Sequence, residues 1–381
     1  MRRDVYDEEH EAFRDLVRQF IDKEVAPHFA EWERAHQVPR ELYKRMGDVG
    51  IMGMTVPEEY GGGGVTSFKF NAVLTEESVR QHVMLGTSAV HLDIILPYVL
   101  TLATDVQKRR WLPGMAAGEL MTAIAMSEPG TGSDLSGIAT TARRDGDDWV
   151  LSGAKTFITG GILADLVIVV ARTSREEDPR AGLTLLVVER DMPGFTRGRN
   201  LEKVGLHASD TAELFFDDVR VPAANVLGVE GAAFMYLARN LAQERLSIAV
   251  GSQAGAVAAL ETTIAYTGQR KAWGRPVSSF QNTKFELADC ATDVEAGQAL
   301  LDRALNAHDR GELTQADAAK VKLFCSEVQG RVVDRCVQLH GGYGYMLEYP
   351  IAKMWASARP SRIFGGTNEV MKLIISKDLG I

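Results

Sequence analysis

The stretch N-L-A-Q-E-R-L-S-I-A-V, residues 240–250, lies within a long helical pattern that spans about residues 232–268. Leu241 and Ile248 stand three residues before and four residues after Glu244, so the three side chains share one face of this helix. A carboxylate on an apolar face either keeps its head in water or is buried, and burial raises its pKa. A buried glutamate would be a base near neutral pH, whereas the solvated alternative is the more common one for an isolated stretch.

The chain around this helix predicts a helical bundle. Further helical patterns span about residues 282–309 and 314–340, with short breaks between them, as in an antiparallel bundle. Two stretches interrupt the pattern, Q-L-H-G-G-Y-G-Y at 338–345 and R-I-F-G-G-T-N-E at 362–369. Glycines directly after a helix usually form a C-cap. Two such stretches in one bundle, each mixing glycines with polar groups, favour a ligand site.

Before the bundle, a segment that begins near Leu120 predicts an all-β domain. Short runs rich in β-branched and aromatic residues alternate with turn signals, and their spacing favours a sandwich or barrel over a Rossmann domain. These runs are residues 122–126, 149–152, 155–159, 166–171, 183–188 and 212–216. The first connection, S-E-P-G-T-G-S-D at 127–134, is rich in small residues whose backbone N–H groups can surround a ring or a phosphate.

The N-terminal third predicts helices. An amphipathic helix with apolar residues from Phe13 to Ile21 is interrupted by Pro27, and further helical patterns follow. These cover about residues 39–50, 68–80, 87–104 and 105–118. The four glycines at 61–64 have no preceding strand and no phosphate-loop signature, so we expect a flexible connector there.

Composition excludes several classes of protein. The 381 residues include 42 Lys and Arg and 51 Asp and Glu, a net charge of −9 without a basic run, so we expect no nucleic-acid partner. Cys290, Cys325 and Cys336 lack metal-ligand spacing, and we expect reduced core thiols and no metal. Residues 1–10 are charged, and no apolar run reaches the ~20 residues that span a bilayer. We therefore expect a bacterial cytoplasmic protein without a membrane span.

Five segments, in this order, resemble those of the acyl-CoA dehydrogenases. They are M-S-E-P-G-T-G-S at 126–133, K-T-F-I-T at 155–159, Q-R-K-A-W-G at 269–274, Q-L-H-G-G-Y-G at 338–344 and I-F-G-G-T-N-E at 363–369. The resemblance covers essentially the whole chain. It implies the α+β fold of this family: an N-terminal helical domain at 1–119, a middle β-barrel or sandwich domain at 120–226, and a C-terminal four-helix bundle at 227–381.

The resemblance also implies FAD as the cofactor, in a homotetramer built as a dimer of dimers. Ser127 and Thr159 would lie near the pyrimidine edge and N5 of the flavin, and Phe157 would flank the ring, where many relatives carry Trp. Arg270, Gln281 and residues 338–342 resemble positions that hold the diphosphate and adenine across a subunit interface. The full set of implied cofactor contacts is Met126, Ser127, Gly132, Ser133, Phe157, Ile158, Thr159, Arg270, Gln281, Gln338, Leu339, His340, Gly341, Gly342, Thr367, Asn368 and Glu369.

The catalytic base is where this sequence departs from the commonest family pattern. Most relatives carry a glutamate in the final loop at the position of Gly365, and a glycine cannot accept a proton. The isovaleryl-CoA and long-chain branches instead place it on the long bundle helix, directly before an arginine, which matches Glu244 and Arg245. The resemblance therefore identifies Glu244 as the α-proton acceptor. The implied substrate contacts are Ser133, Ala242, Gln243, Glu244, Arg245, Gly365 and Gly366.

The sequence at residues 210–216, 241–245 and 365–372 is more similar to the long-chain branch. This resemblance implies a straight medium- to long-chain acyl-CoA as the substrate. An isovaleryl-CoA or other short branched-chain enzyme is the alternative. The family implies electron-transferring flavoprotein as the electron acceptor. An acyl-CoA oxidase is disfavoured because that family usually has a long extra C-terminal region, and flavin monooxygenases or nitroalkane oxidases usually change the base or the CoA contacts. A non-enzymatic scaffold usually lacks a base or a flavin motif.

Overall fold

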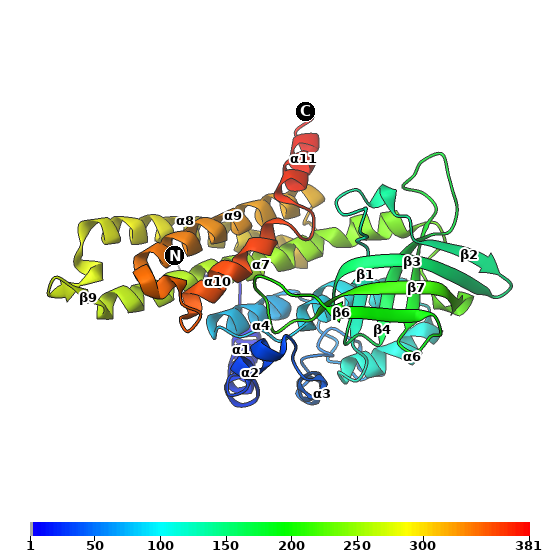
Figure 1. Ribbon diagram of the computed structural model, residues 1–381, viewed down its shortest axis with the longest axis horizontal. Coiled ribbons are helices and arrows are strands. Elements are labelled where there is room, and N and C mark those ends of the chain that lie inside the picture. Colours follow the sequence, from blue (N-terminus) through cyan, green and yellow to red (C-terminus); the bar gives the residue numbers. More distant parts are fainter. Residues whose placement is uncertain (1–2) are drawn as a thin grey trace.

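The computed structural model describes residues 3–381 and consists of a sheet at one end and a long bundle of helices at the other (Figure 1). The longest helix, α7 (Ala233–Gln269), extends from the sheet to the far end of the bundle. The N-terminal helices pack beneath α7 and against the sheet (Figure 1). The order helices, strands, helices agrees with the predicted α+β class.

The N-terminal helices begin with α1, whose first turn is capped by the Asp7 side chain, which accepts hydrogen bonds from the N–H groups of Glu9 and His10. The predicted helix at 87–104 contains a π-helical segment, η3, directly before α5. The elements of this part are α1 (Glu8–Phe20), η1 (Ile21–Val25), α2 (Phe29–Ala35), α3 (Arg40–Asp48), η2 (Glu58–Tyr60), α4 (Lys69–Arg80), η3 (Val90–Ile95), α5 (Leu96–Leu102) and α6 (Asp105–Ala116).

The prediction of a flexible connector at residues 61–64 is wrong. The Gly63 N–H donates to the carbonyl of Gly53 at 3.0 Å, and a β-carbon on Gly62 would overlap the carbonyl oxygen of Val56. The glycines therefore allow close backbone approaches in a hydrogen-bonded loop, which a count of glycines alone does not distinguish from a mobile linker.

The middle part is one eight-stranded sheet with the order β6-β7-β3-β2-β4-β5-β8, and β1 pairs in parallel with β4. The predicted runs 149–152 and 155–159 form a single strand, β3, which shifts register against β7 at two places. The strands are β1 (Thr122–Ala125), β2 (Thr141–Asp145), β3 (Asp148–Thr159), β4 (Leu166–Arg172), β5 (Leu183–Glu189), β6 (Phe195–Asn200), β7 (Thr211–Pro222) and β8 (Val226–Leu227).

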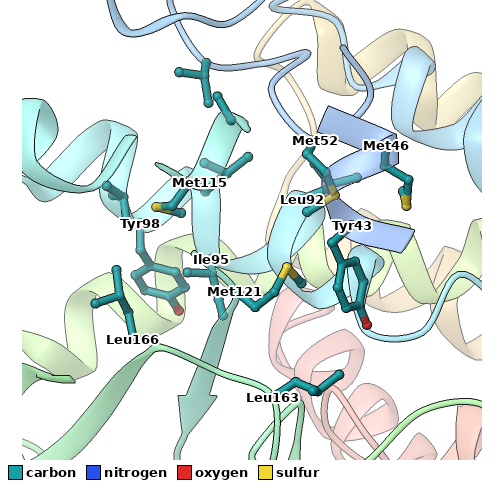
Figure 2. Close-up of a cluster of buried hydrophobic side chains, with 14 of the residues drawn as sticks. Tyr43, Met46, Met52, Leu92, Ile95, Tyr98, Met115, Met121, Leu163 and Leu166 are labelled. Atoms are coloured by element: carbon teal, nitrogen blue, oxygen red, sulfur yellow. The ribbon is translucent and has the colours of Figure 1, made fainter. Parts of the chain in front are cut away.

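Strands β4 and β5 are buried on both faces, which explains their continuous apolar runs. Along β4, Leu166 and Ile168 face a core shared with the N-terminal helices, whereas Val167 and Val169 face a second core within the β domain. In the first core, Tyr98 of α5 and side chains of α3, α6 and β4 lie around Met121 (Figure 2). This packing joins the helical and β parts.

The C-terminal part contains the predicted bundle. α7 is long and apolar enough to cross a membrane by length and composition, but 61% of its most apolar window is buried inside the protein, and it is the central helix of the bundle. The three cysteines are free and buried, as predicted. The other elements are β9 (Lys271–Ala272), β10 (Arg275–Pro276), η6 (Val277–Ser279), α8 (Gln281–Asp309), α9 (Gln315–His340), η7 (Gly341–Tyr345), α10 (Pro350–Ala358), η8 (Arg359–Arg362) and α11 (Asn368–Asp378).

Candidate active site

The Glu244 side chain is buried, so of the two alternatives, a solvated carboxylate and a buried one, the structure has the buried one. It is 8% exposed, and its carboxylate forms no hydrogen bond or ion pair with any of residues 3–381. Burial raises its pKa to about 7, and the neighbouring Arg245 guanidinium opposes this shift only partly. The buried phenol of Tyr98 also has a raised pKa, first because of its own burial and then because of the Glu244 charge. Glu244 is therefore a carboxylate that titrates near neutral pH.

Gly365, in the loop between η8 and α11, lies beside this carboxylate. Its φ is +64° and that of Gly366 is +88°, so the two residues form a turn that favours glycine. A β-carbon built on Gly365 would lie 3.7 Å from Glu244 Oε1 and would overlap Ile248 Cδ1. A side chain at position 365 would therefore enter the space beside Glu244. The glycine turn (Gly365 and Gly366) leaves this space to the carboxylate on α7.

Arg245 connects the glycine turn to the bundle. Its guanidinium is 4% exposed and donates from Nη1 to Gln315 Oε1 at 2.8 Å and from Nε to the Gly365 carbonyl at 3.5 Å. Of the other predicted substrate contacts, Gln243 donates to the backbone carbonyl of Asp93 in η3 at 2.7 Å, so its amide points toward the N-terminal helices. The structure thus brings together Glu244, Arg245 and the glycine turn.

A second group of predicted residues lies on the β domain. The N–H of Thr156 donates to the carbonyl of Ser127 at 2.9 Å, so the 127–134 loop lies beside β3. Phe157 sits where β3 loses register with β7, has φ +57°, and is 72% exposed. An exposed aromatic ring, together with the half-buried Ser127 and Thr159, fits the flat face and polar edge of a flavin.

A buried ion pair that the sequence analysis missed holds the 127–134 loop against β3. Lys155 is fully buried and donates from Nζ to Glu128 Oε1 at 2.8 Å and to the Met126 carbonyl at 3.1 Å. Glu128 also accepts from the N–H groups of Ala139 and Thr140. Because a buried lysine requires a partner, the pair fixes the loop against β3. The alternation of β3, which points Lys155 inward, was the available signal.

A third group of predicted cofactor residues, Arg270, Gln281 and residues 338–342, lies at the opposite end of the bundle from the β domain. Arg270 follows α7, and residues 338–342 close α9, at the end marked by the β9 hairpin (Figure 1). From Glu244, 26 residues of helix lead to Arg270, which corresponds to about 39 Å at 1.5 Å per residue. Gln281 begins α8 at this same end. Arg270, Gln281 and residues 338–342 are therefore remote from Glu244 within one chain.

Several predicted residues have structural partners of their own. His340 is 4% exposed, with Nδ1 2.8 Å from the Cys336 carbonyl and its ring stacked on Tyr266 at 4.2 Å. Thr367 caps α11 through a hydrogen bond from the N–H of Val370. Asn368 is 3% exposed and faces α9, whereas Glu369, Gln338, Gly341 and Gly342 are exposed and Leu339 is half-buried.

Comparison with known proteins assigns the family. Three family models match in order: the acyl-CoA dehydrogenase N-terminal domain at residues 7–119, the middle domain at 123–219 and the C-terminal domain at 233–380. The chain belongs to the acyl-CoA dehydrogenase family, and the predicted fold class is confirmed. Its members are FAD-dependent oxidoreductases that act on CH–CH groups.

Individual relatives cover the whole chain. The chain is 44% identical over 378 residues to the mitochondrial long-chain specific acyl-CoA dehydrogenase of Sus scrofa, covering 99% of this chain and 88% of the relative. The crystal structure of an acyl-CoA dehydrogenase from Geobacillus kaustophilus matches with a TM-score of 0.97 and 45% identity over 100% of both chains. A glutaryl-CoA dehydrogenase from Mycobacterium smegmatis, solved in complex with FADH2, matches with a TM-score of 0.90 and 31% identity, covering 98% of this chain and 95% of that one. The relatives include both long-chain and short-chain enzymes.

The burial of Glu244 predicts a pH-dependent cost in stability. The carboxyl pKa is raised from 4.5 to about 7 on folding, so the folded state binds more protons and loses stability as pH rises through this interval. Above pH 7 the ionised group costs about 3 kcal/mol. We expect Glu244→Gln to melt at a higher temperature than the wild type at pH 8 and at a similar temperature at pH 5.

The exposed carboxylate Glu261, on the same helix, provides the matched control. Glu261→Gln should change the melting temperature little at either pH. A Glu244→Gln difference that is the same at pH 5 and pH 8 would show that Glu244 is not titrating in the folded protein.

Proposed function

We propose that Glu244 removes the α-proton of an acyl-CoA thioester that lies between α7 and the glycine turn. The main support is the Glu244–Gly365 pair: a buried carboxylate with a pKa near 7 faces a loop position that has no side chain. A base whose pKa is close to the working pH combines a large ionised fraction with good proton affinity. The carboxylate on the bundle helix thus replaces the missing carboxylate of the loop.

The other residues bind and polarise the thioester. The Gly365 N–H would donate to the thioester carbonyl, where negative charge develops as the α C–H bond breaks. The α-proton passes to Glu244 Oε1 or Oε2, and the electron pair of the broken α C–H bond forms the new C=C bond. The β-hydrogen leaves as a hydride, with the electron pair of its own C–H bond. Bound FAD, held beside Ser127, Phe157 and Thr159, would supply the acceptor for that hydride. The burial of Glu244 keeps water from the carboxylate and strengthens both electrostatic contributions.

Replacing the base tests this role directly. We expect Glu244→Gln to retain its bound FAD while anaerobic flavin reduction by acyl-CoA falls by a factor of about 10²–10⁴. In the wild type, the reduction rate should rise with pH up to about pH 7, because the ionised carboxylate is the active form. Near-normal reduction by Glu244→Gln would exclude Glu244 as the base.

We further propose a straight medium- to long-chain acyl group as the substrate. Support comes from the similarity of residues 241–245 and 365–372 to the long-chain branch and from the 44% identity to a long-chain specific enzyme. Isovaleryl-CoA is the alternative. We expect anaerobic flavin reduction to be at least about tenfold more efficient with octanoyl- to palmitoyl-CoA than with butyryl- or isovaleryl-CoA, since each methylene in an apolar pocket contributes about 1–3 kcal/mol. A preference for isovaleryl-CoA would favour the branched-chain alternative.

We propose electron-transferring flavoprotein as the electron acceptor, which the family resemblance implies.

We also propose that two copies of the chain complete each cofactor site. The predicted flavin-ring residues lie on the β domain at one end of α7, and Arg270 follows its other end, so Arg270 would serve the partner's flavin. The hairpin end also exposes large apolar side chains, with Trp273 at 90%, Tyr345 at 84% and Leu347 at 66%. Such a patch is typical of a surface covered by another subunit. Family resemblance further implies a dimer of dimers.

Mixing two inactive variants tests the shared site. Arg270→Ala should weaken FAD binding, and Glu244→Gln should abolish proton abstraction. In a mixed dimer, one site combines Glu244 from one chain with Arg270 from the other, so co-expression should restore activity in about half of the sites of each mixed dimer. If co-purified mixed dimers stay as inactive as either variant alone, each site is built within one chain. Dimers of each single variant serve as controls.

A further inference from the structure

A second lysine in the protein interior lies against the glycine turn. Lys322 on α9 is 0% exposed, and its Nζ donates to the Gly366 carbonyl at 2.9 Å and to Asn368 Oδ1 at 2.9 Å. Both acceptors belong to the short segment that leads from Gly365 into α11. The ammonium thus connects the middle of α9 with the loop that faces Glu244.

This ammonium is buried without a carboxylate partner. Lys155, the other fully buried lysine, has Glu128 at 2.8 Å, whereas no carboxylate in residues 3–381 lies within 4.0 Å of Lys322 Nζ. Burial, assisted by the neighbouring Arg245 charge, lowers the Lys322 pKa to about 8, and the more distant Glu369 and Glu327 only partly oppose this. A buried charge satisfied only by neutral oxygens is costly, so a purely structural role would be served at least as well by an uncharged residue.

The acceptor side of this contact is rigid. Asn368 is itself held by α9, because its Nδ2 donates to Ser326 Oγ at 3.1 Å and to Glu327 Oε1 at 2.7 Å. On the other flank, Arg245 Nε approaches the Gly365 carbonyl at 3.5 Å. The two consecutive carbonyls of the glycine turn therefore both point at cations, one from α7 and one from α9.

We propose that Lys322 is a positioning residue for the dehydrogenation: together with Arg245 it fixes the carbonyls of the glycine turn and so holds the turn opposite Glu244. This inference rests on the proposed function, in which the turn binds the thioester carbonyl. Two glycines with positive φ have no side chains of their own to fix their conformation, and the backbone would otherwise sample many arrangements. The same two positive charges favour the negative charge that develops on the thioester oxygen.

The test separates proton removal from hydride transfer. In D2O, a thioester with sulfur in place of its β-methylene can exchange its α-hydrogens but has no β-hydrogen to transfer, so NMR of this exchange reports on Glu244 and the turn. Lys322→Met keeps an unbranched side chain, one atom shorter, and removes both hydrogen bonds. We expect exchange to slow about 10- to 100-fold while FAD content and the KM of the acyl-CoA stay within about twofold. Lys322→Arg, which keeps charge and donors, should recover part of the rate.

Lys320 provides the matched control, because it lies on the same helix but forms ion pairs with Asp317 and Asp378 at the surface. Lys320→Met should exchange at the wild-type rate. Wild-type exchange in Lys322→Met, or a loss that only parallels loss of FAD, would overturn the proposal. If Lys322→Met fails to fold, Lys322→Gln removes the charge with a side chain one atom shorter, and wild-type exchange in that folded variant would also overturn the proposal.

The result for Glu244→Gln distinguishes failure of the role proposed for Lys322 from failure of the role proposed for Glu244. If Glu244→Gln abolishes exchange and Lys322→Met does not, the role of Lys322 fails and that of Glu244 stands. If Glu244→Gln exchanges normally, the proposed function fails, and with it the purpose assigned to the glycine turn.

Discussion

Keeping the Glu244 carboxylate out of water is the constraint on which the rest of the site depends. An isolated buried anion is strongly disfavoured, so the group either finds a partner or takes up a proton. Here the Arg245 guanidinium lies close enough to reduce the rise in the Glu244 pKa, but it donates its hydrogen bonds to Gln315 and the glycine turn. The carboxylate therefore stays unpaired, with a pKa near 7, and the folded protein carries this cost in stability at the place where a base is useful.

The glycine turn and the carboxylate depend on each other. The turn approaches α7 so closely that a β-carbon at position 365 would overlap Ile248, and this approach is what surrounds Glu244 with protein. A turn of two glycines has little conformational preference of its own. Its geometry is imposed from outside, by the buried cations that reach its carbonyls from α7 and α9.

The long helix α7 gives the molecule its layout. It carries Glu244 near the β domain and ends at the β9 hairpin, where Arg270 lies (Figure 1). The β domain, which carries the exposed Phe157, lies near the start of this helix, and the exposed Trp273 lies just beyond its end. In the proposed shared site, association of two chains would bring these ends together without any bending of the helix.

Much of the fold could be predicted from periodicity, because the helices and the inner strands bury regular apolar faces. Strands β2 and β6 were missed because they are largely exposed, with sequences T-A-R-R-D and F-T-R-G-R-N that show no apolar alternation. The π-helical turn in η3 and the left-handed backbone of Phe157 leave no mark in a hydrophobic pattern. Lys322 lay between Val321 and Cys325 in a helical pattern, where a long side chain is usually assumed to reach solvent.

The sequence by itself determined the family, the order of helical and β parts, and the complementary presence of Glu244 and absence of a carboxylate at Gly365. These are properties of residue identity and spacing, which are read directly from the sequence. Only the tertiary structure decided that Glu244 is buried, that Lys155 and Lys322 are interior, and that the two predicted cofactor groups lie far apart. Burial and distance depend on contacts between residues remote in sequence: the local helix is the same for a solvated carboxylate and a buried one, and the packing of α9 and the glycine turn against α7 makes the difference.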